Sequence, residues 1–184
     1  MPPPSESDVH VIIVMGVSGA GKTTVGQALA KELRWAFYEG DVFHPPRNIE
    51  KMAAGQPLTD DDRAPWLAAL RRLIDDLLAR GERAVIACSA LRHQYRKRLT
   101  PEGRQHDAVT FVYLGVPVAV LRVRLRERQG HFMTEALLDS QLATLEPPRN
   151  ALPVDGTRSV EEIVREVLQG LGLKNRLRSS GPIA

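Results

Sequence analysis

The sequence predicts an α/β fold in which a five-stranded parallel sheet has helices on both faces. Short apolar runs rich in β-branched residues alternate with longer segments whose apolar residues recur at helical spacing. Strands that alternate with helices in this way are typical of right-handed crossovers between parallel strands. The chain has 184 residues, of which 43% are hydrophobic, and this suits a single domain with a normal core.

The first half of the chain contributes two strands and the longest helix. We expect a strand at 9–15, a helix at 23–33, a strand at 36–41, a short helix around 49–54 and a helix at 65–80. The long helix has a stripe of leucines, with Pro65 at its start and Gly81 after it. Proline suits a first helical turn, and glycine suits the residue that follows a helix. The segment from Val42 to Asp62 otherwise reads as irregular.

The second half continues the same alternation. We expect strands at 83–88, 109–114 and 152–154, and helices at 117–128, 134–145 and 160–168. In open parallel sheets, ligands bind beyond the carboxyl ends of the strands. The loops that should hold the chemistry are therefore those that follow Met15, Tyr38, Cys88 and Leu114.

A glycine-rich loop follows the first predicted strand. Residues Gly16 to Thr23 match G-x-x-x-x-G-K-[ST], the phosphate-binding P-loop, at every fixed position. Glycines let the backbone curl so that successive N–H groups point at an anion, and the next helix adds its positive dipole end. Lys22 supplies a cation for the β- and γ-phosphates of ATP, and the Thr23 hydroxyl can ligate Mg²⁺. The residues expected to hold the nucleotide here are Gly16, Val17, Ser18, Gly19, Ala20, Gly21, Lys22, Thr23 and Thr24.

Two carboxylates lie at the end of the second predicted strand. A kinase whose acceptor is a hydroxyl group needs a carboxylate within reach of that hydroxyl to take its proton. Asp41 is the best-placed candidate, and alternation along a strand turns Glu39 to the same face. Either residue could support Mg²⁺ through water, and the alternative is that either only caps the next turn. Many P-loop proteins end the third strand in an aspartate for Mg²⁺, whereas this chain has Cys88 and Ser89 there, so Asp41 must carry more of that role.

The third strand is followed by a basic segment at 92–98. This segment is either a solvated helix face or a source of anchors for an anionic group. Its place at a strand end favours Arg92 and Arg96 as anchors, because a guanidinium binds a carboxylate bidentately. Cys88 is expected to be a small buried packing residue rather than a nucleophile.

Four arginines alternate on the helix that precedes a glycine-bearing loop. Arg124 and Arg128 lie four residues apart, and the loop reaches His131. Arginines on a mobile lid can close over a transferring phosphate and exclude water. Arg122 and Arg126 lie on another side of the helix, and an exposed arginine ladder is the alternative reading. We favour Arg124 for the nucleotide and Arg128 for catalysis, because their face continues toward the lid.

Composition limits the compartment and the partners. A single cysteine excludes a disulfide framework, which favours a reducing cytoplasm, and no apolar run reaches membrane-spanning length. We expect a disordered segment at 1–8, one P-loop kinase domain at 9–173 with a lid around 124–134, and a flexible basic tail at 174–184. The tail could also act as a nucleic-acid arm. We do not expect nucleic acid as a partner, because the net charge is only +3.

Five strings extend the match well beyond the P-loop. They are MGVSGAGKTTVG, EGDVFHPPRNIEKMAAGQPLTDDDRAPWL, CSALRHQYRKRL, RLRERQGHFM and LLDSQLATLEPP, and they span about Val11 to Pro148. Together they resemble the gluconokinases of bacteria and eukaryotes, small P-loop kinases that phosphorylate D-gluconate. The second string is far more specific than the P-loop and separates this group from the shikimate and adenylate kinases. The chain departs from the family at Glu39, where aspartate is frequent, and in its basic tail.

The resemblance implies a three-layer P-loop kinase fold with a small mobile lid. It also implies that ATP and D-gluconate give ADP and 6-phospho-D-gluconate in the presence of Mg²⁺. Asp41 would then take the proton of the 6-hydroxyl, while Arg63, Arg92 and His131 or Gln141 would contact gluconate. Gluconokinases are commonly dimeric, which implies a homodimer. Two alternatives stay open: a kinase for another small acceptor such as shikimate or a nucleoside monophosphate, and a nucleotide-switch or RNA-associated binding module.

Overall fold

The computed structural model describes residues 9–127 and 135–173, and it confirms the predicted α/β class. Five parallel strands form one sheet in the order β2-β3-β1-β4-β5. The strands are β1 (Val11–Met15), β2 (Ala36–Glu39), β3 (Ala84–Ala87), β4 (Val109–Gly115) and β5 (Leu152–Asp155). The terminal segments predicted at 1–8 and 174–184 lie outside the described residues, as do residues 128–134 of the predicted lid.

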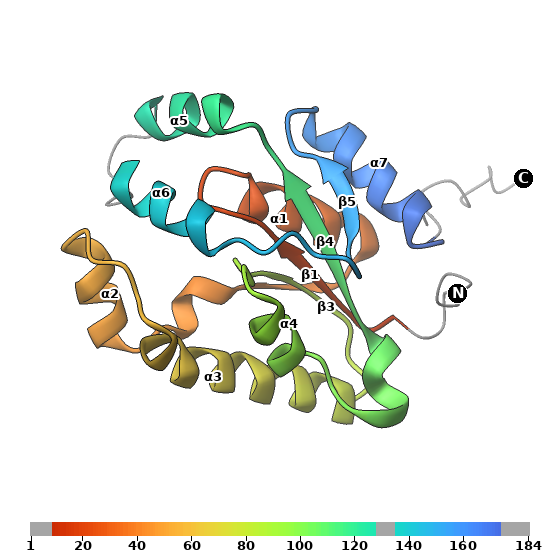
Figure 1. Cartoon of the computed structure of the whole chain (residues 1–184). Helices are drawn as coiled ribbons and strands as arrows, with labels where there is room; N and C mark the ends of the chain where they lie inside the picture. The colour runs from red at the N-terminus through yellow and green to blue at the C-terminus, as the bar shows by residue number, and fades with distance from the viewer. Residues whose placement is uncertain (1–8, 128–134, 174–184) are drawn as a thin grey trace, which may run out of the picture.

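Helices cover both faces of the sheet, as the alternation predicted (Figure 1). They are α1 (Lys22–Leu33), α2 (Pro46–Ala53), α3 (Asp60–Ala79), α4 (His93–Leu99), α5 (Val118–Glu127), α6 (Glu135–Thr144) and α7 (Val160–Gly170), with 3₁₀ turns η1 (Gly40–Phe43) and η2 (Gly103–Ala108). β1 is buried on both sides: Ile12 and Val14 pack with α1 and α7, while Ile13 and Met15 pack with α3 and α4. The molecule therefore has three layers, with β1 at the centre of the sheet.

The helix α3 begins at Asp60, five residues before the predicted start at Pro65. Thr59 caps it: the Asp62 N–H donates to Thr59 Oγ1 (3.2 Å), and the Thr59 N–H donates to Asp62 Oδ2 (2.9 Å). This reciprocal capping box satisfies N–H groups that have no partner within the helix, so the helix extends ahead of its proline. The predicted start was wrong because we expected Pro65 to be the first residue of the helix, whereas the structure places it inside the helix.

The second strand is shorter than predicted and ends at Glu39. A tight 3₁₀ turn follows, and a Cβ on Gly40 would lie 2.4 Å from the Ala87 carbonyl oxygen, so only glycine fits. The Trp66 indole N–H donates to the Gly40 carbonyl (2.8 Å) and fixes the turn against α3. Asp41 therefore lies in the 3₁₀ turn, beyond the end of the strand. Strand alternation does not extend to it, so alternation cannot place Glu39 and Asp41 on one face as predicted.

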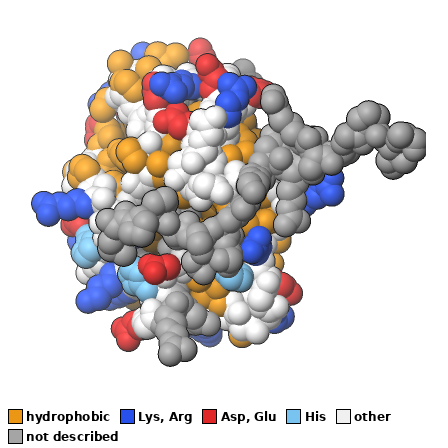
Figure 2. All heavy atoms as spheres, turned by 90° about the vertical axis from the view of Figure 1, so that its right-hand side faces the viewer, with side chains coloured by type: hydrophobic (Ala, Val, Ile, Leu, Met, Phe, Trp, Pro, Cys, Tyr) orange, Lys and Arg blue, Asp and Glu red, His pale blue; other side chains and the backbone are white. Residues whose placement is uncertain are grey.

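Charged side chains of both signs are interspersed on the face that Figure 2 shows. Neither sign gathers into a continuous field on the part of this face that is not drawn in grey. In the part of the chain that the structure describes, no helix is both long and apolar enough to cross a membrane.

Candidate active site

The P-loop has the backbone geometry that an anion site requires. Gly16, Gly19 and Gly21 have φ angles of 147°, 83° and 98°, a region that side chains with a Cβ rarely adopt. Gly21 is the N-cap of α1 and has no side chain to occupy the first-turn N–H groups. Lys22 opens that helix, and its Nζ donates to the Val17 carbonyl across the loop (3.1 Å). A glycine-built loop that leads into a helix N-terminus opened by a lysine fits the phosphates of a nucleotide.

Thr23 and Glu39 meet at the edge of the P-loop. The Thr23 hydroxyl donates to Glu39 Oε2 (2.6 Å), which joins the first turn of α1 to the end of β2. Residues 9–127 and 135–173 contain no group of three or more His, Cys, Asp or Glu side chains that could hold a metal. One hydroxyl and one carboxylate suit Mg²⁺, which keeps several waters and is shared with substrate phosphates rather than enclosed by protein.

A pocket opens beside the P-loop at the carboxyl ends of the strands. Five of the predicted site residues line it: Ser18, Lys22, Asp41, Arg63 and Gln141. They come from the P-loop, α1, η1, α3 and α6, which are separated by up to 123 residues in the sequence. The pocket therefore places a phosphate-binding cation, a carboxylate and a guanidinium around one space. Within residues 9–127 and 135–173, Asp41 forms no ion pair.

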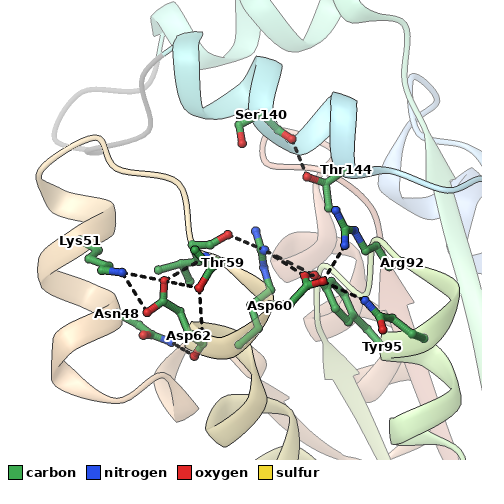
Figure 3. Close-up of polar contacts among 12 residues, drawn as sticks. Asn48, Lys51, Thr59, Asp60, Asp62, Arg92, Tyr95, Ser140 and Thr144 are labelled. Carbon is green, nitrogen blue, oxygen red and sulfur yellow. Dashed lines mark hydrogen bonds and ion pairs between the residues drawn. The ribbon is translucent and has the colours of Figure 1, made fainter.

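Arg63 and Arg92 are held differently, although both were predicted to bind substrate. Arg63 lines the pocket, and its Nη1 donates to the Leu58 carbonyl (2.5 Å). Arg92 stands outside the pocket lining, where its Nη1 donates to Asp60 Oδ2 (2.6 Å). Tyr95 donates to the other oxygen of Asp60, as Figure 3 shows. The Tyr95 hydroxyl and the nearby guanidinium of Arg92 hold the pKa of Asp60 below its usual value.

A second polar cluster joins α2 to the start of α3. Lys51 Nζ pairs with both carboxylate oxygens of Asp62 (2.7 and 2.9 Å), and this bond lowers the pKa of Asp62 well below its usual range (Figure 3). Asn48 Nδ2 donates to the Asp62 carbonyl (2.7 Å) and contacts His44 Nδ1 (3.1 Å). The sequence interpretation missed His44, which lines the pocket. The available signal was its place three residues after Asp41, directly after the turn that closes β2.

Helices α5 and α6 contact the P-loop from the lid side. The Ser18 N–H donates to Gln141 Oε1 (2.7 Å), so Gln141 contacts the P-loop as well as the pocket. Arg124 donates to the carbonyls of Gly19 (3.2 Å) and Gly156 (2.9 Å), whereas Arg122 and Arg126 pair with α6 carboxylates. The helix therefore turns Arg124 toward the nucleotide loop and the other two away. Arg128 and His131 lie outside the described residues.

Two residues after β3 have structural roles, of which the sequence interpretation foresaw that of Cys88 but not that of Arg96. Arg96 is only 8% exposed and donates to the carbonyls of Ala90 (2.9 Å), Leu91 (3.1 Å) and Glu146 (3.1 Å). Its guanidinium therefore binds main chain, and the prediction that it anchors an anionic group does not fit this position. Cys88 is fully buried, and burial raises the pKa of its thiol to about 12, which fits a packing residue.

Comparison with known proteins identifies the family to which this chain belongs. The family described as an AAA domain matches residues 11–148. The gluconokinase of Gluconobacter oxydans is 45% identical over 161 residues, covering 86% of this chain and 89% of the relative.

Two solved structures share the fold over nearly the whole chain. A sugar kinase from Janibacter sp. superposes with a TM-score of 0.82 at 40% identity, covering 91% of this chain and 96% of that one. A gluconokinase from Sinorhizobium meliloti gives a TM-score of 0.77 at 45% identity, covering 90% and 93%. With its P-loop, its pocket and these relatives, the chain belongs to the gluconokinase family of P-loop kinases.

Proposed function

We propose that the protein is an ATP-dependent gluconokinase (EC 2.7.1.12), which phosphorylates the 6-hydroxyl of D-gluconate and releases ADP. The observation that supports it most is the convergence of Lys22, Asp41 and Arg63 on one pocket beside the P-loop. Gluconate has a terminal hydroxyl for a carboxylate base and a carboxylate for a guanidinium. The relatives named gluconokinase match over most of the chain, which favours this acceptor over shikimate or a nucleoside monophosphate.

The proposed mechanism gives each group of the pocket one task. The P-loop N–H groups and Lys22 bind the phosphates and stabilise the charge that grows on them during transfer. Asp41 accepts the proton of the 6-hydroxyl as its oxygen attacks, and Arg63 binds the carboxylate end of gluconate. Gln141 and Arg124, on the lid side, hold the P-loop in place. We assign Arg92 to the edge of the gluconate site, with Asp60 orienting it. From the family resemblance, we assign Arg128 to catalysis on the lid side and His131 to gluconate binding.

We also propose that Thr23 and Glu39 support Mg²⁺, with Asp41 available to it through water. Bound Mg²⁺ would neutralise phosphate charge. The contact between the Thr23 hydroxyl and Glu39 supports this assignment, since it sets an oxygen pair at the P-loop edge.

Replacing Glu39 with glutamine tests the metal assignment. Glutamine keeps the size of the side chain but removes the negative charge, so we expect E39Q to need about 10-fold more free Mg²⁺ for half-maximal activity. The measurement is a Mg²⁺ titration of kcat at saturating ATP and gluconate. The control is E50Q, because Glu50 lies exposed on α2. An unchanged Mg²⁺ midpoint in E39Q contradicts the assignment.

An ADP-release assay over a panel of acceptors tests the function itself. We expect gluconate to be turned over at least 10²-fold more efficiently than shikimate or nucleoside monophosphates, because few acceptors offer both a carboxylate and a terminal hydroxyl. A better acceptor in the panel would move the protein to another kinase activity. ATP binding without turnover of any acceptor, together with salt-sensitive RNA binding, would favour a binding module instead.

The family resemblance further supports a homodimer in the cytoplasm, which we include in the proposal. The net charge of +3 gives little reason to add nucleic acid as a partner. Sedimentation of the full chain at micromolar concentration measures the oligomeric state directly.

A further inference from the structure

The mechanism above gives no role to the imidazole of His44, which is one of the polar groups of the pocket. His44 directly follows the 3₁₀ turn that carries Asp41, and its backbone N–H donates to the Asp41 carbonyl (3.2 Å). The residue is 8% exposed and lines the same pocket as Asp41. One short turn therefore sets the positions of both side chains.

The contacts of Asn48 determine which ring nitrogen of His44 carries the proton. Asn48 Nδ2 lies 2.7 Å from the Asp62 carbonyl, which can only accept, so this atom is the amide nitrogen. The same NH₂ group lies 3.1 Å from His44 Nδ1 and must donate to it as well. Nδ1 is therefore an acceptor, and the neutral ring carries its hydrogen on Nε2.

The surroundings of the ring keep it neutral. Burial is the main cause that lowers the pKa of His44 to about 4; Arg63 acts in the same direction, and Asp41 acts against both. The ring also stacks on Trp66, with centroids 4.3 Å apart and an interplanar angle of 13°. Trp66 is itself fixed by its bond to the Gly40 carbonyl (2.8 Å). At pH 7 the imidazole is thus a fixed, uncharged donor.

The Nε2–H group is directed into the pocket. Nδ1 is used by Asn48, and one face of the ring is covered by Trp66. Within the described residues, the only buried side-chain nitrogen or oxygen without a hydrogen-bond partner is Glu32 Oε1. His44 Nε2 makes no hydrogen bond to the described residues, and it is not one of the buried atoms without a partner. The Nε2 atom is therefore accessible to solvent. That space is the pocket that His44 lines.

We propose that His44 is a specificity-determining residue that donates Nε2–H to the substrate hydroxyl oxygen next to the hydroxyl that Asp41 deprotonates. The Asp41 carboxylate can only accept and the neutral His44 ring can only donate at Nε2, so the pair matches two adjacent hydroxyls. In gluconate these are the 6-hydroxyl and the 5-hydroxyl. The inference rests on the proposed gluconokinase function and deepens it. The site would recognise two adjacent hydroxyls at the end of the substrate chain.

Three substitutions at His44 isolate the donor. Phenylalanine keeps an aromatic ring on Trp66 but has no donor. Glutamine places an NH₂ group near the position of Nε2, whereas asparagine places one near Nδ1, and both lose the aromatic stack. With gluconate we expect H44F and H44N to raise KM about 10-fold, while H44Q stays within about 3-fold of the wild type. The KM for ATP should be unchanged in all three, because the nucleotide site does not involve this residue.

A substrate without the 5-hydroxyl provides the decisive comparison. With 5-deoxy-D-gluconate, the wild type should lose about 10-fold in kcat/KM, and H44F should lose almost nothing further. If kcat/KM of H44F falls below that of the wild type by the same factor on both substrates, His44 only packs the turn. That result overturns the inference and leaves the kinase assignment intact. The same holds if H44N and H44Q behave alike. Absence of gluconate turnover in the wild type would instead overturn the proposed function, and the role of His44 with it.

Discussion

Replacing Asp41 with asparagine is expected to lower kcat for gluconate by about 10²- to 10⁴-fold. The amide has nearly the shape of the carboxylate but cannot take a proton from the acceptor hydroxyl. Asp41 lies in the pocket beside Lys22 and is not held by an ion pair within the described residues, so its carboxylate is available to substrate. Steady-state kinetics with gluconate and ATP measure the change, and nucleotide affinity is followed separately by titration with ADP.

The matched control for D41N is D75N. Asp75 is exposed on α3 and pairs with Arg71 four residues earlier (2.8 Å), and such a surface pair contributes little. We expect D75N to keep the activity of the wild type and D41N to keep its affinity for ADP. Turnover by D41N within a few-fold of the wild type would show that another group takes the proton.

Replacing Arg96 with methionine is expected to lower the free energy of unfolding by about 3 kcal/mol. Methionine approximates the bulk of the side chain but removes the donor of the Ala90 and Glu146 carbonyls, while the Leu91 carbonyl keeps only the Glu146 N–H (2.9 Å). Ala90 is fully buried and has a φ of 44°, a conformation that an alanine adopts only when its surroundings hold it there. The hydrogen bonds of Arg96 therefore stabilise the strained backbone at Ala90, after β3.

Denaturant unfolding of R96M, R96K and K97M measures this effect. Lys97 is the neighbouring exposed residue on α4, so K97M should change stability by less than about 0.5 kcal/mol. R96K should fall between the two, because an ammonium cannot match the spread of a guanidinium across three carbonyls. Since Leu91 lines the pocket, the KM of R96M for gluconate should rise more than its KM for ATP. Equal stabilities of R96M and K97M would contradict the bracing role.

Local patterns in the sequence were sufficient for the sheet and the P-loop. The β-branched runs predicted β1, β3 and β4 because a buried parallel strand is apolar on both faces. The edge strands β2 and β5 are partly exposed, and the alternation of strands with helices predicted them. The P-loop was assigned because its glycines, Lys22 and Thr23 act through the backbone they belong to, and that chemistry is local. The start of α3 was misplaced because two local signals compete there, and the capping box at Thr59 outweighs the proline at position 65.

The partners of the site arginines could not be predicted in the same way. Arg92 and Arg96 lie four residues apart on one basic segment and looked equivalent. Packing turns Arg96 into the interior against three carbonyls, while Arg92 meets Asp60, which is 32 residues away in the sequence. Which face of a short helix is buried depends on the elements that pack against it, and a single sequence does not report that.

The sequence by itself determined the order of strands and helices, the phosphate loop and the position of Asp41 after the second strand, because each depends on residues that are close in the chain. Only the tertiary structure decided that Gln141 contacts Ser18 across 123 residues, and that Asn48 and Trp66 hold His44 in the pocket. These contacts form when the helices dock on the sheet, and the direction of a side chain across such a junction is set by packing rather than by local pattern.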